Sequence, residues 1–220
     1  MSHARLLALL MLAFVAGGCI QVPDEDAIPP SAELAKPAST IVTMKAWPAA
    51  DSKEADFTPL FNGTNLDGWK ADAEAKFAVK EGAIVIESGK GLLRTEQAYQ
   101  DFELHAEFRL PVAGADSGIF FRITDAIRYQ VQTKDADDLG EIRSAKVTQN
   151  HDKEATSRVR KPVGEWQTFD VLVKGQECWV KLNGELVAYA TGLAEPSGPI
   201  GIQAEDFPVE FRGLRVRNVR

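Results

Sequence analysis

GADSGIFFRITDAIRYQVQ, residues 114–132, contains two segments that alternate like β-strands, joined by a short polar turn. Side chains two positions apart in a strand point to the same face. Phe120 and Arg122 are therefore expected on one face of the first strand, and Gln130 and Gln132 on one face of the second. This pair of strands predicts a sheet whose polar face carries the function, around which the rest of the chain is arranged.

The segments on either side repeat the alternation. Residues 101–110, DFELHAEFRL, place apolar side chains on one face and polar ones on the other, which is typical of a half-buried antiparallel strand. Asn183-Gly184 between two strand-like runs indicates a two-residue hairpin, and the slip in alternation at Arg212-Gly213 indicates a bulge. About ten or more short strands without an amphipathic helix predict an all-β sandwich or barrel.

Residues 133–161 form a polar excursion, with at most a short strand at 145–149. Long loops in compact domains are often functional. Its carboxylates Asp135, Asp137 and Asp138 suggest a calcium site as one interpretation and a solvated acidic loop as the other. No cluster of His, Asp and Glu has the spacing of metal ligands, so we expect no metal and no cofactor.

Length, charge and composition limit the classes of function. The chain has 220 residues, 45% of them hydrophobic, which suits one domain with an appendage. The net charge of −7 makes nucleic acid an unsuitable partner, because phosphate binding needs a basic patch. Cys178 lies in a strand-like run and is expected to be a small buried hydrophobe.

The first 19 residues predict export. A basic start, a short apolar run and small residues before Cys19 are typical of a bacterial lipoprotein signal, with lipidation of Cys19; an ordinary secretory signal is the alternative. Residues 20–56, rich in Pro and Ala, predict a flexible tether, and residues 57–220 the folded domain. We therefore expect a protein of the bacterial cell envelope, at the outer membrane or the periplasmic face, that contacts the membrane through its lipid alone.

Six motifs occur in the order that one known family shows. They are LFNGTNLDGW (60–69), FELHAEFRL with DSGIFFR (102–122), YQVQ (129–132), GEWQTFDVLVKG (164–175), LNG (182–184) and GPIGIQAEDFPVEFRGLRV (198–216). Together they resemble the 3-keto-disaccharide hydrolase domain family, long described as a domain of unknown function. The resemblance implies a concanavalin A-like jelly-roll β-sandwich of two antiparallel sheets, export, and action on glycosides oxidised at C3.

A 3-keto sugar implies a specific chemistry. The ketone acidifies the C2 proton, so that a base can remove it, the group at C1 can leave by elimination, and water can add afterwards. This route needs a base near C2 and a group that stabilises the enolate oxygen. Ordinary glycoside hydrolysis needs two carboxylates that flank C1 instead.

The polar faces of the strands supply the candidate residues. Glu107 is the predicted base, and Arg109 or Arg122 would hold the keto or enolate oxygen. All three are expected on the sheet that carries the glutamines, although a cross-strand ion pair is the competing interpretation of Glu107 and Arg109. The predicted substrate-binding residues are Asp116, Tyr129, Gln130, Gln132, Gln203 and Glu205, with Trp166 or Tyr129 as a platform for a sugar ring.

The chain departs from the family pattern at three positions. Asp116 stands where the family commonly has Asn, Gln130 stands where it commonly has an acidic residue, and Gln203 is not followed by the usual His. A glutamine amide cannot act as a general base. Glu205 or Asp116 would have to compensate in an active enzyme. The alternatives are a non-catalytic carbohydrate-binding module on the same fold and a structural lipoprotein domain.

Overall fold

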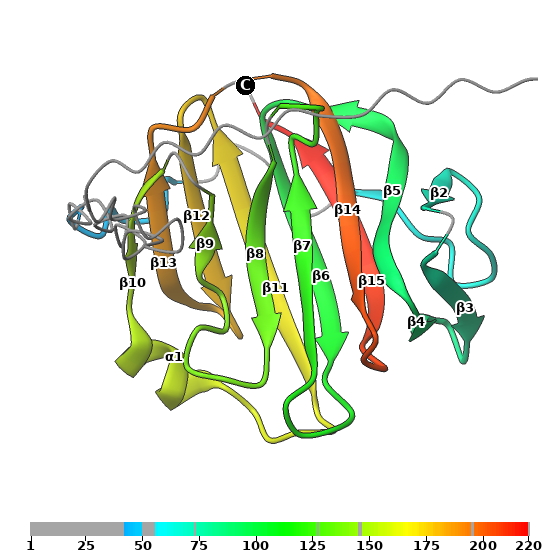
Figure 1. Ribbon diagram of the computed structural model, residues 1–220. Coiled ribbons are helices and arrows are strands. Elements are labelled where there is room, and N and C mark those ends of the chain that lie inside the picture. The colour runs from blue at the N-terminus through cyan, green and yellow to red at the C-terminus, as the bar shows by residue number, and fades with distance from the viewer. Residues whose placement is uncertain are drawn as a thin grey trace, which may run out of the picture. The chain divides into compact units, whose positions relative to one another are not determined.

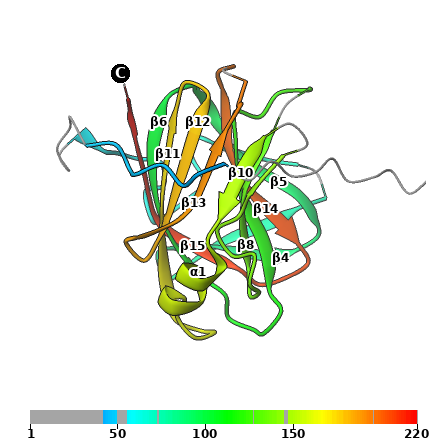
Figure 2. The same ribbon diagram turned by 90° about the vertical axis from the view of Figure 1, so that its left-hand side faces the viewer.

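Two antiparallel sheets face each other in the computed structural model, as Figures 1 and 2 show. This confirms the predicted all-β sandwich. The larger sheet has nine strands in the order β10 (Thr148–His151), β13 (Glu185–Thr191), β12 (Glu177–Leu182), β11 (Trp166–Lys174), β6 (Phe102–Arg109), β15 (Glu210–Asn218), β4 (Ala83–Ser88) and β3 (Lys76–Lys80), with β1 (Thr58–Pro59) paired to β15. The six-stranded sheet has the order β2 (Trp69–Ala71), β5 (Lys90–Tyr99), β14 (Gly198–Glu205), β7 (Asp116–Phe121), β8 (Tyr129–Lys134) and β9 (Ile142–Arg143).

The structure describes residues 42–49, 56–72, 74–126, 128–144, 147–194 and 196–219. These ranges belong to a unit that spans Ser39–Arg220. The signal segment with Cys19 and most of the tether lie outside the described residues. Within those ranges no helix has the length and apolar character needed to cross a membrane.

The core lies between the sheets and is built by the alternation seen in the sequence. In β6, Leu104 and Phe108 are buried while Glu103 and Glu107 on the other face are partly exposed. The ring of Phe108 stacks on Phe169 of β11, with centroids 4.5 Å apart. Each such side chain contributes roughly 1.5–3 kcal/mol by leaving water, so the alternation largely decides which face of each strand points inward.

Arg122 occupies the end of the sandwich instead of the polar face that we predicted. β7 ends at Phe121, and Arg122 has a φ of 48°, so the strand alternation stops before it. Its guanidinium is fully buried and donates to the carbonyls of Gln100 (2.9 Å), Gly175 (2.9 Å) and Ala194 (2.7 Å), and to the carboxylate of Asp101 (2.9 Å). The prediction that Arg122 contacts substrate is therefore wrong: this side chain joins three loops.

The predicted hairpin and bulge are both present. Asn183 and Gly184 have φ values of 49° and 87° between β12 and β13, as a primed two-residue turn requires. The pairing of β15 with β6 shifts between Arg212 and Arg215, around Gly213. These local signals act through neighbouring residues alone, which is why the sequence reveals them.

One helix was missed in the polar excursion. α1 (Lys153–Val159) begins after Asp152, whose carboxylate accepts a hydrogen bond from the backbone N–H of Ala155 at 2.8 Å. Seven residues are too few for a helical period to stand out in a sequence. The excursion thus contains β9, β10 and α1, where we expected a loop with at most one strand.

Residues 42–49 lie against the outer face of the nine-stranded sheet, although the sequence placed them within the tether. Met44 and Trp47 pack on a cluster that contains Trp179 and Tyr189, and the Trp179 indole donates to the carbonyl of Lys45 at 3.1 Å. In Figure 2 this segment crosses β11 and β12. It covers aromatic side chains that the sheet alone would leave in water.

Replacing Arg122 by Met tests its role in stability. We expect the free energy of unfolding to fall by about 3–5 kcal/mol, because Asp101 would keep a partly buried charge without its partner. Urea denaturation followed by tryptophan fluorescence measures the change. Arg128→Met, at an exposed position, is the control and should stay within about 0.5 kcal/mol of wild type. Equal midpoints for the two variants would contradict the assignment.

Candidate functional site

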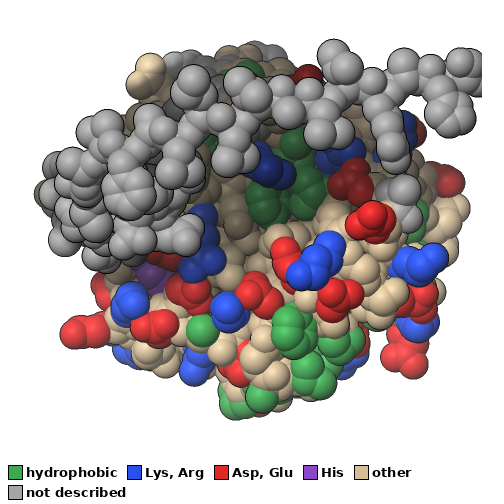
Figure 3. Space-filling model, in the orientation of Figure 1, with side chains coloured by type: hydrophobic (Ala, Val, Ile, Leu, Met, Phe, Trp, Pro, Cys, Tyr) green, Lys and Arg blue, Asp and Glu red, His purple; other side chains and the backbone are tan. Residues whose placement is uncertain are grey.

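The outer face of the six-stranded sheet collects polar side chains from its central strands. Residues of β7 and β8 pair directly, with Gly118 opposite Gln132 and Asp116 opposite Lys134. On the other side of β7, β14 contributes Gln203 and Glu205. Figure 3 shows this face with acidic and basic side chains gathered on it, and with a hollow that exposes hydrophobic and basic side chains.

Five of these side chains form one continuous set of hydrogen bonds, which we name the amide chain. Gln130 Nε2 lies at the centre and donates to Gln132 Oε1 at 2.8 Å and to Gln203 Oε1 at 3.1 Å. Gln132 Nε2 donates to Asp116 Oδ1 at 2.9 Å, and Gln203 Nε2 donates to Glu205 Oε1 at 2.6 Å. The sequence predicted all five as substrate-binding residues, and the structure brings them together on one face.

A lysine stands at each end of the amide chain. Lys134 Nζ lies 2.9 Å from Asp116, and Lys90 Nζ lies 3.7 Å from Glu205. The hydrogen bond with Asp116 raises the pKa of Lys134 above its ordinary value, with the charge of Asp116 acting in the same direction. Both ends of the amide chain are thus charged carboxylates that are balanced by a cation.

Gly118 leaves the space in which Gln130 lies. A Cβ atom on Gly118 would stand 2.3 Å from Gln130 Nε2 and 2.8 Å from its Cγ. The Gln130 side chain therefore crosses the bare backbone of β7 to reach Gln203 on β14. Any larger residue at position 118 would displace Gln130 from the centre of the amide chain.

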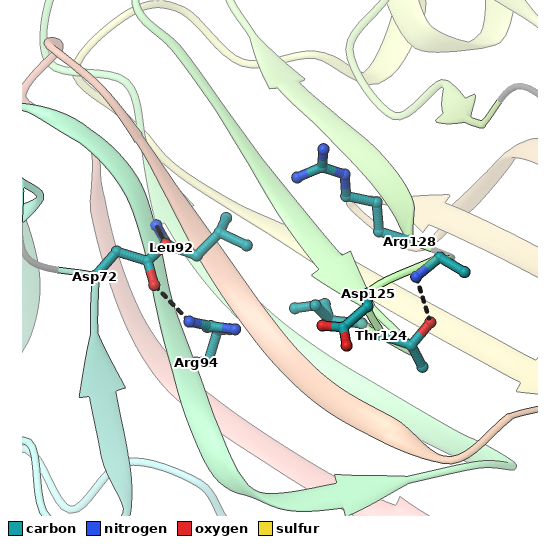
Figure 4. Close-up of a pocket in the computed structure, with 8 residues that line it drawn as sticks. Asp72, Leu92, Arg94, Thr124, Asp125 and Arg128 are labelled. Carbon is teal, nitrogen blue, oxygen red and sulfur yellow. Dashed lines mark hydrogen bonds and ion pairs between the residues drawn. The ribbon is translucent and has the colours of Figure 1, made fainter.

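A pocket of about 330 Å³ lies beside the amide chain, between the first half of β5 and the loop after β7. Two of its lining residues belong to β5, which pairs with β14. Arg94 lies opposite Gly201, and Leu92 lies opposite Gln203 of the amide chain. Figure 4 shows Arg94 hydrogen-bonded to Asp72 on one side, with Asp125 on its other side and no bond between Arg94 and Asp125. We name it the Arg94 pocket; its lining residues are Asp72, Leu92, Arg94, Ile123, Thr124, Asp125, Ala126 and Arg128.

Two charged side chains of the Arg94 pocket have no ion pair within the described parts of the chain. They are the carboxylate of Asp125 and the guanidinium of Arg128, both exposed and both on the loop between β7 and β8. Neither these two residues nor Asp72 and Arg94 were predicted from the sequence. Their place between two strands of the polar sheet was the available signal for Asp125 and Arg128, since such loops often carry function.

The predicted base and its arginine lie elsewhere. Glu107 and Arg109 belong to β6 of the nine-stranded sheet and face outward on the opposite side of the sandwich. Glu107 accepts from Arg212 Nε at 2.8 Å, and Arg109 pairs with Glu210. The expectation that they share a sheet with Gln130 is wrong, and they form the cross-strand ion pairs of the competing interpretation.

The two aromatic candidates are also away from the amide chain. Tyr129 is buried on the core face, where its ring stacks on Phe121 at 5.4 Å and its hydroxyl accepts from the Ala194 N–H at 2.6 Å. Its prediction as a substrate-binding residue is wrong, because it precedes Gln130 by one position in the strand. Trp166 lies on the nine-stranded sheet with the guanidinium of Arg212 over its ring, 3.9 Å from the centroid.

The acidic residues considered for calcium pair with basic side chains instead. Asp135 lies 3.6 Å from Arg160, Asp137 lies 2.8 Å from Lys153, and Asp138 pairs with Arg143. Across the described ranges, no three His, Cys, Asp or Glu side chains gather in a way that would hold a metal ion.

Comparison with known proteins places this geometry in context. The model of the 3-keto-alpha-glucoside-1,2-lyase-like domain matches residues 56–217. No curated protein sequence is significantly similar to the chain. The fold is shared with solved structures at low identity, and the β-sandwich found here is of the same kind as in a β-glucanase of Bacillus licheniformis (TM-score 0.50, 13% identity, 74% of this chain and 97% of that one).

Three further structures share the fold over most of the described chain. Two crystal structures from Parabacteroides distasonis, each described as a "putative glycosyl hydrolase", have TM-scores of 0.60 and 0.59 and identities of 18% and 22%. They cover 76% and 74% of this chain and 95% and 99% of their own. A carbohydrate-binding module of Bacillus subtilis, CBM66, has a TM-score of 0.51 and 13% identity, with 69% of this chain and 96% of its own covered.

Replacing Gly118 by Ala tests the amide chain. The added methyl group should expel Gln130, and the side-chain amide signals of Gln130, Gln132 and Gln203 should shift in ¹⁵N NMR spectra. The free energy of unfolding should fall by about 1–3 kcal/mol, the usual cost of overpacking. In a Gln130→Ala background the same substitution should cost much less, because the clash is gone. An equal cost in both backgrounds would contradict this geometry.

Proposed function

Because the chain belongs to the 3-keto-alpha-glucoside-1,2-lyase-like domain family, we propose that it binds a carbohydrate on the outer face of the six-stranded sheet and cleaves the glycosidic bond of a 3-keto-glycoside there. The observation that carries the proposal is the juxtaposition of the Arg94 pocket and the amide chain. The pocket offers a carboxylate and a guanidinium that have no ion pair within the described residues, and the amide chain lies beside it.

The proposed reaction assigns Asp125 and Arg128 to the bond-breaking step. The Asp125 carboxylate takes the proton from C2, and the electron pair of the C–H bond moves to the C3 ketone as an enolate that Arg128 stabilises. The enolate then forms the C1–C2 double bond and expels the oxygen at C1, which takes a proton from water. The hydroxide left from that water adds to C1, and Asp125 returns its proton to C2, which gives the free 3-keto sugar and restores the carboxylate.

The amide chain is proposed to bind hydroxyl groups of the same substrate. Gln130 and Gln203 are partly exposed, and Gln203 lies opposite Leu92 of the pocket, whereas Gln132 is buried and holds Gln130 in place. The guanidinium of Arg94 is hydrogen-bonded to Asp72, so it lines the pocket in a fixed position. Glu107 has no role in this mechanism, because it lies on the other face of the sandwich.

A non-catalytic sugar-binding module is the second candidate. It is favoured by the composition of the amide chain, whose central residue is Gln130 and whose carboxylates already accept hydrogen bonds from its amides. A module of this kind would bind 3-keto-glycosides at the same face without releasing sugar. The fold is compatible with both functions, since it is shared with a carbohydrate-binding module and with proteins described as glycosyl hydrolases.

Turnover of 3-keto-trehalose and 3-keto-glucosides by the purified protein tests the enzyme proposal. We expect release of free sugar, and a fall in kcat of about 10²–10⁴-fold for Asp125→Asn, the usual contribution of a general base. Glu107→Gln removes a carboxylate from the opposite sheet and should keep wild-type activity. Full activity of Asp125→Asn would exclude the proposed base. Saturable binding without turnover would favour the sugar-binding module.

The location that we propose is the bacterial cell envelope, with a lipid on Cys19. Metabolic labelling with an alkyne fatty acid should mark the wild-type protein in the membrane fraction. Cys19→Ser should abolish labelling, whereas Cys178→Ser should not, because Cys178 is fully buried in the core. Labelling that survives Cys19→Ser would exclude this anchor.

A further inference from the structure

We propose that Gln130 is the specificity-determining residue of the outer face, and that it selects a neutral sugar by presenting an oriented carbonyl acceptor to one sugar hydroxyl. The inference deepens the proposed function and rests on it for the identity of the ligand. Its structural part concerns the direction of three amides. That part is testable without a ligand.

The carboxylates at the ends orient the amide chain. An ionised carboxylate can only accept hydrogen bonds, so Asp116 and Glu205 require the NH₂ groups of Gln132 and Gln203. The carbonyl oxygens of both glutamines then point inward, where Gln130 Nε2 donates to each of them. Reversing any one amide would bring two acceptors or two donors together.

This orientation leaves the side-chain carbonyl oxygen of Gln130 as its one hydrogen-bonding atom that is not used inside the amide chain. Both hydrogens of its NH₂ group are used inside the amide chain, and no donor within the described residues contacts its Oε1. A ligand group that meets this oxygen must donate a hydrogen bond. Sugar hydroxyls donate, whereas the carboxylate of an ionised uronic acid and a phosphate accept and would be repelled.

The charges around the amide chain agree with a neutral ligand. Lys134 and Lys90 are paired with Asp116 and Glu205, and Arg143 on β9 is paired with acidic residues. Arg94 is likewise paired with Asp72. These four cations are therefore paired with carboxylates, and the guanidinium of Arg128 shares the Arg94 pocket with the carboxylate of Asp125.

The same orientation explains why a glutamine suits position 130 in this chain. An ionised glutamate at this position would face the carbonyl oxygens of Gln132 and Gln203. It could remain only if it were protonated, or if both amides turned and placed their carbonyls against Asp116 and Glu205. Gln130, Asp116 and Glu205 thus form a matched set, in which each residue depends on the hydrogen-bonding character of the others.

Titration of the Gln130→Glu variant tests the orientation. The carboxyl ¹³C signal of the introduced glutamate should titrate at least about one pKa unit above the ordinary value of about 4.3, because the neutral acid can donate to an amide carbonyl whereas the carboxylate cannot. Adding Asp116→Asn should bring the pKa down again, since the new side-chain amide can donate to Gln132 and allow it to turn. Adding Glu107→Gln, on the other sheet, should leave the pKa raised. An ordinary pKa in the single variant would overturn the orientation.

Binding of 3-keto-trehalose analogues with one hydroxyl replaced by fluorine tests the selection. Fluorine cannot donate, so at one ring position the replacement should weaken binding about 10-fold in the wild type, and this difference should vanish in Gln130→Leu. A uronic acid analogue should bind more weakly than the neutral sugar. If ligands bind but no position depends on Gln130, the selection is wrong. If no sugar binds at all, the proposed function is wrong, and so is the proposed selection of a neutral sugar. The titration still tests the orientation of the three amides independently.

Discussion

The buried guanidinium of Arg122 holds the point at which β7 ends and the loop toward β8 begins. It contacts three backbone carbonyls and Asp101, which come from three separate loops of the chain. The loop that carries Asp125 and Arg128 starts immediately after it. The position of the Arg94 pocket therefore depends on the ion pair and hydrogen bonds of a fully buried guanidinium. A site built on a loop needs such an anchor, because loop backbone is otherwise mobile.

The amide chain follows a related principle on the surface of the sheet. Polar side chains that are packed together must satisfy one another, and a network is rigid when every member has its partners. Here two carboxylates set the direction of three amides, and two lysines balance the carboxylates. Gly118 supplies the space that this arrangement needs. The result is a pre-oriented polar surface beside a pocket, which is how sugar sites combine specificity with low reorganisation.

The two faces of the sandwich look alike in sequence but differ in their surroundings. Glu107 and Arg109 alternate with apolar residues just as Gln130 and Gln132 do, so alternation alone identified both sets as outward-facing. It does not tell which sheet a strand joins. β6 pairs with β11 and β15, whereas β7, which follows it directly in the chain, pairs with β14 and β8 in the other sheet. Glu107, the predicted base, was assigned to the wrong sheet for this reason, because consecutive strands lie in different sheets.

The sequence by itself determined the class of fold, most strand faces, the hairpin at Asn183-Gly184 and the bulge near Gly213, and it singled out the five residues of the amide chain among six predicted to bind substrate. These features follow from local periodicity, turn chemistry and ordered motifs, all of which depend on residues close together in the chain. Only the tertiary structure decided that Arg122 turns inward, that Tyr129 lies in the core, and that Asp72 and Arg94 meet the loop of Asp125. Those placements arise from strand order and from contacts between residues far apart in sequence, for which a single sequence carries no direct signal.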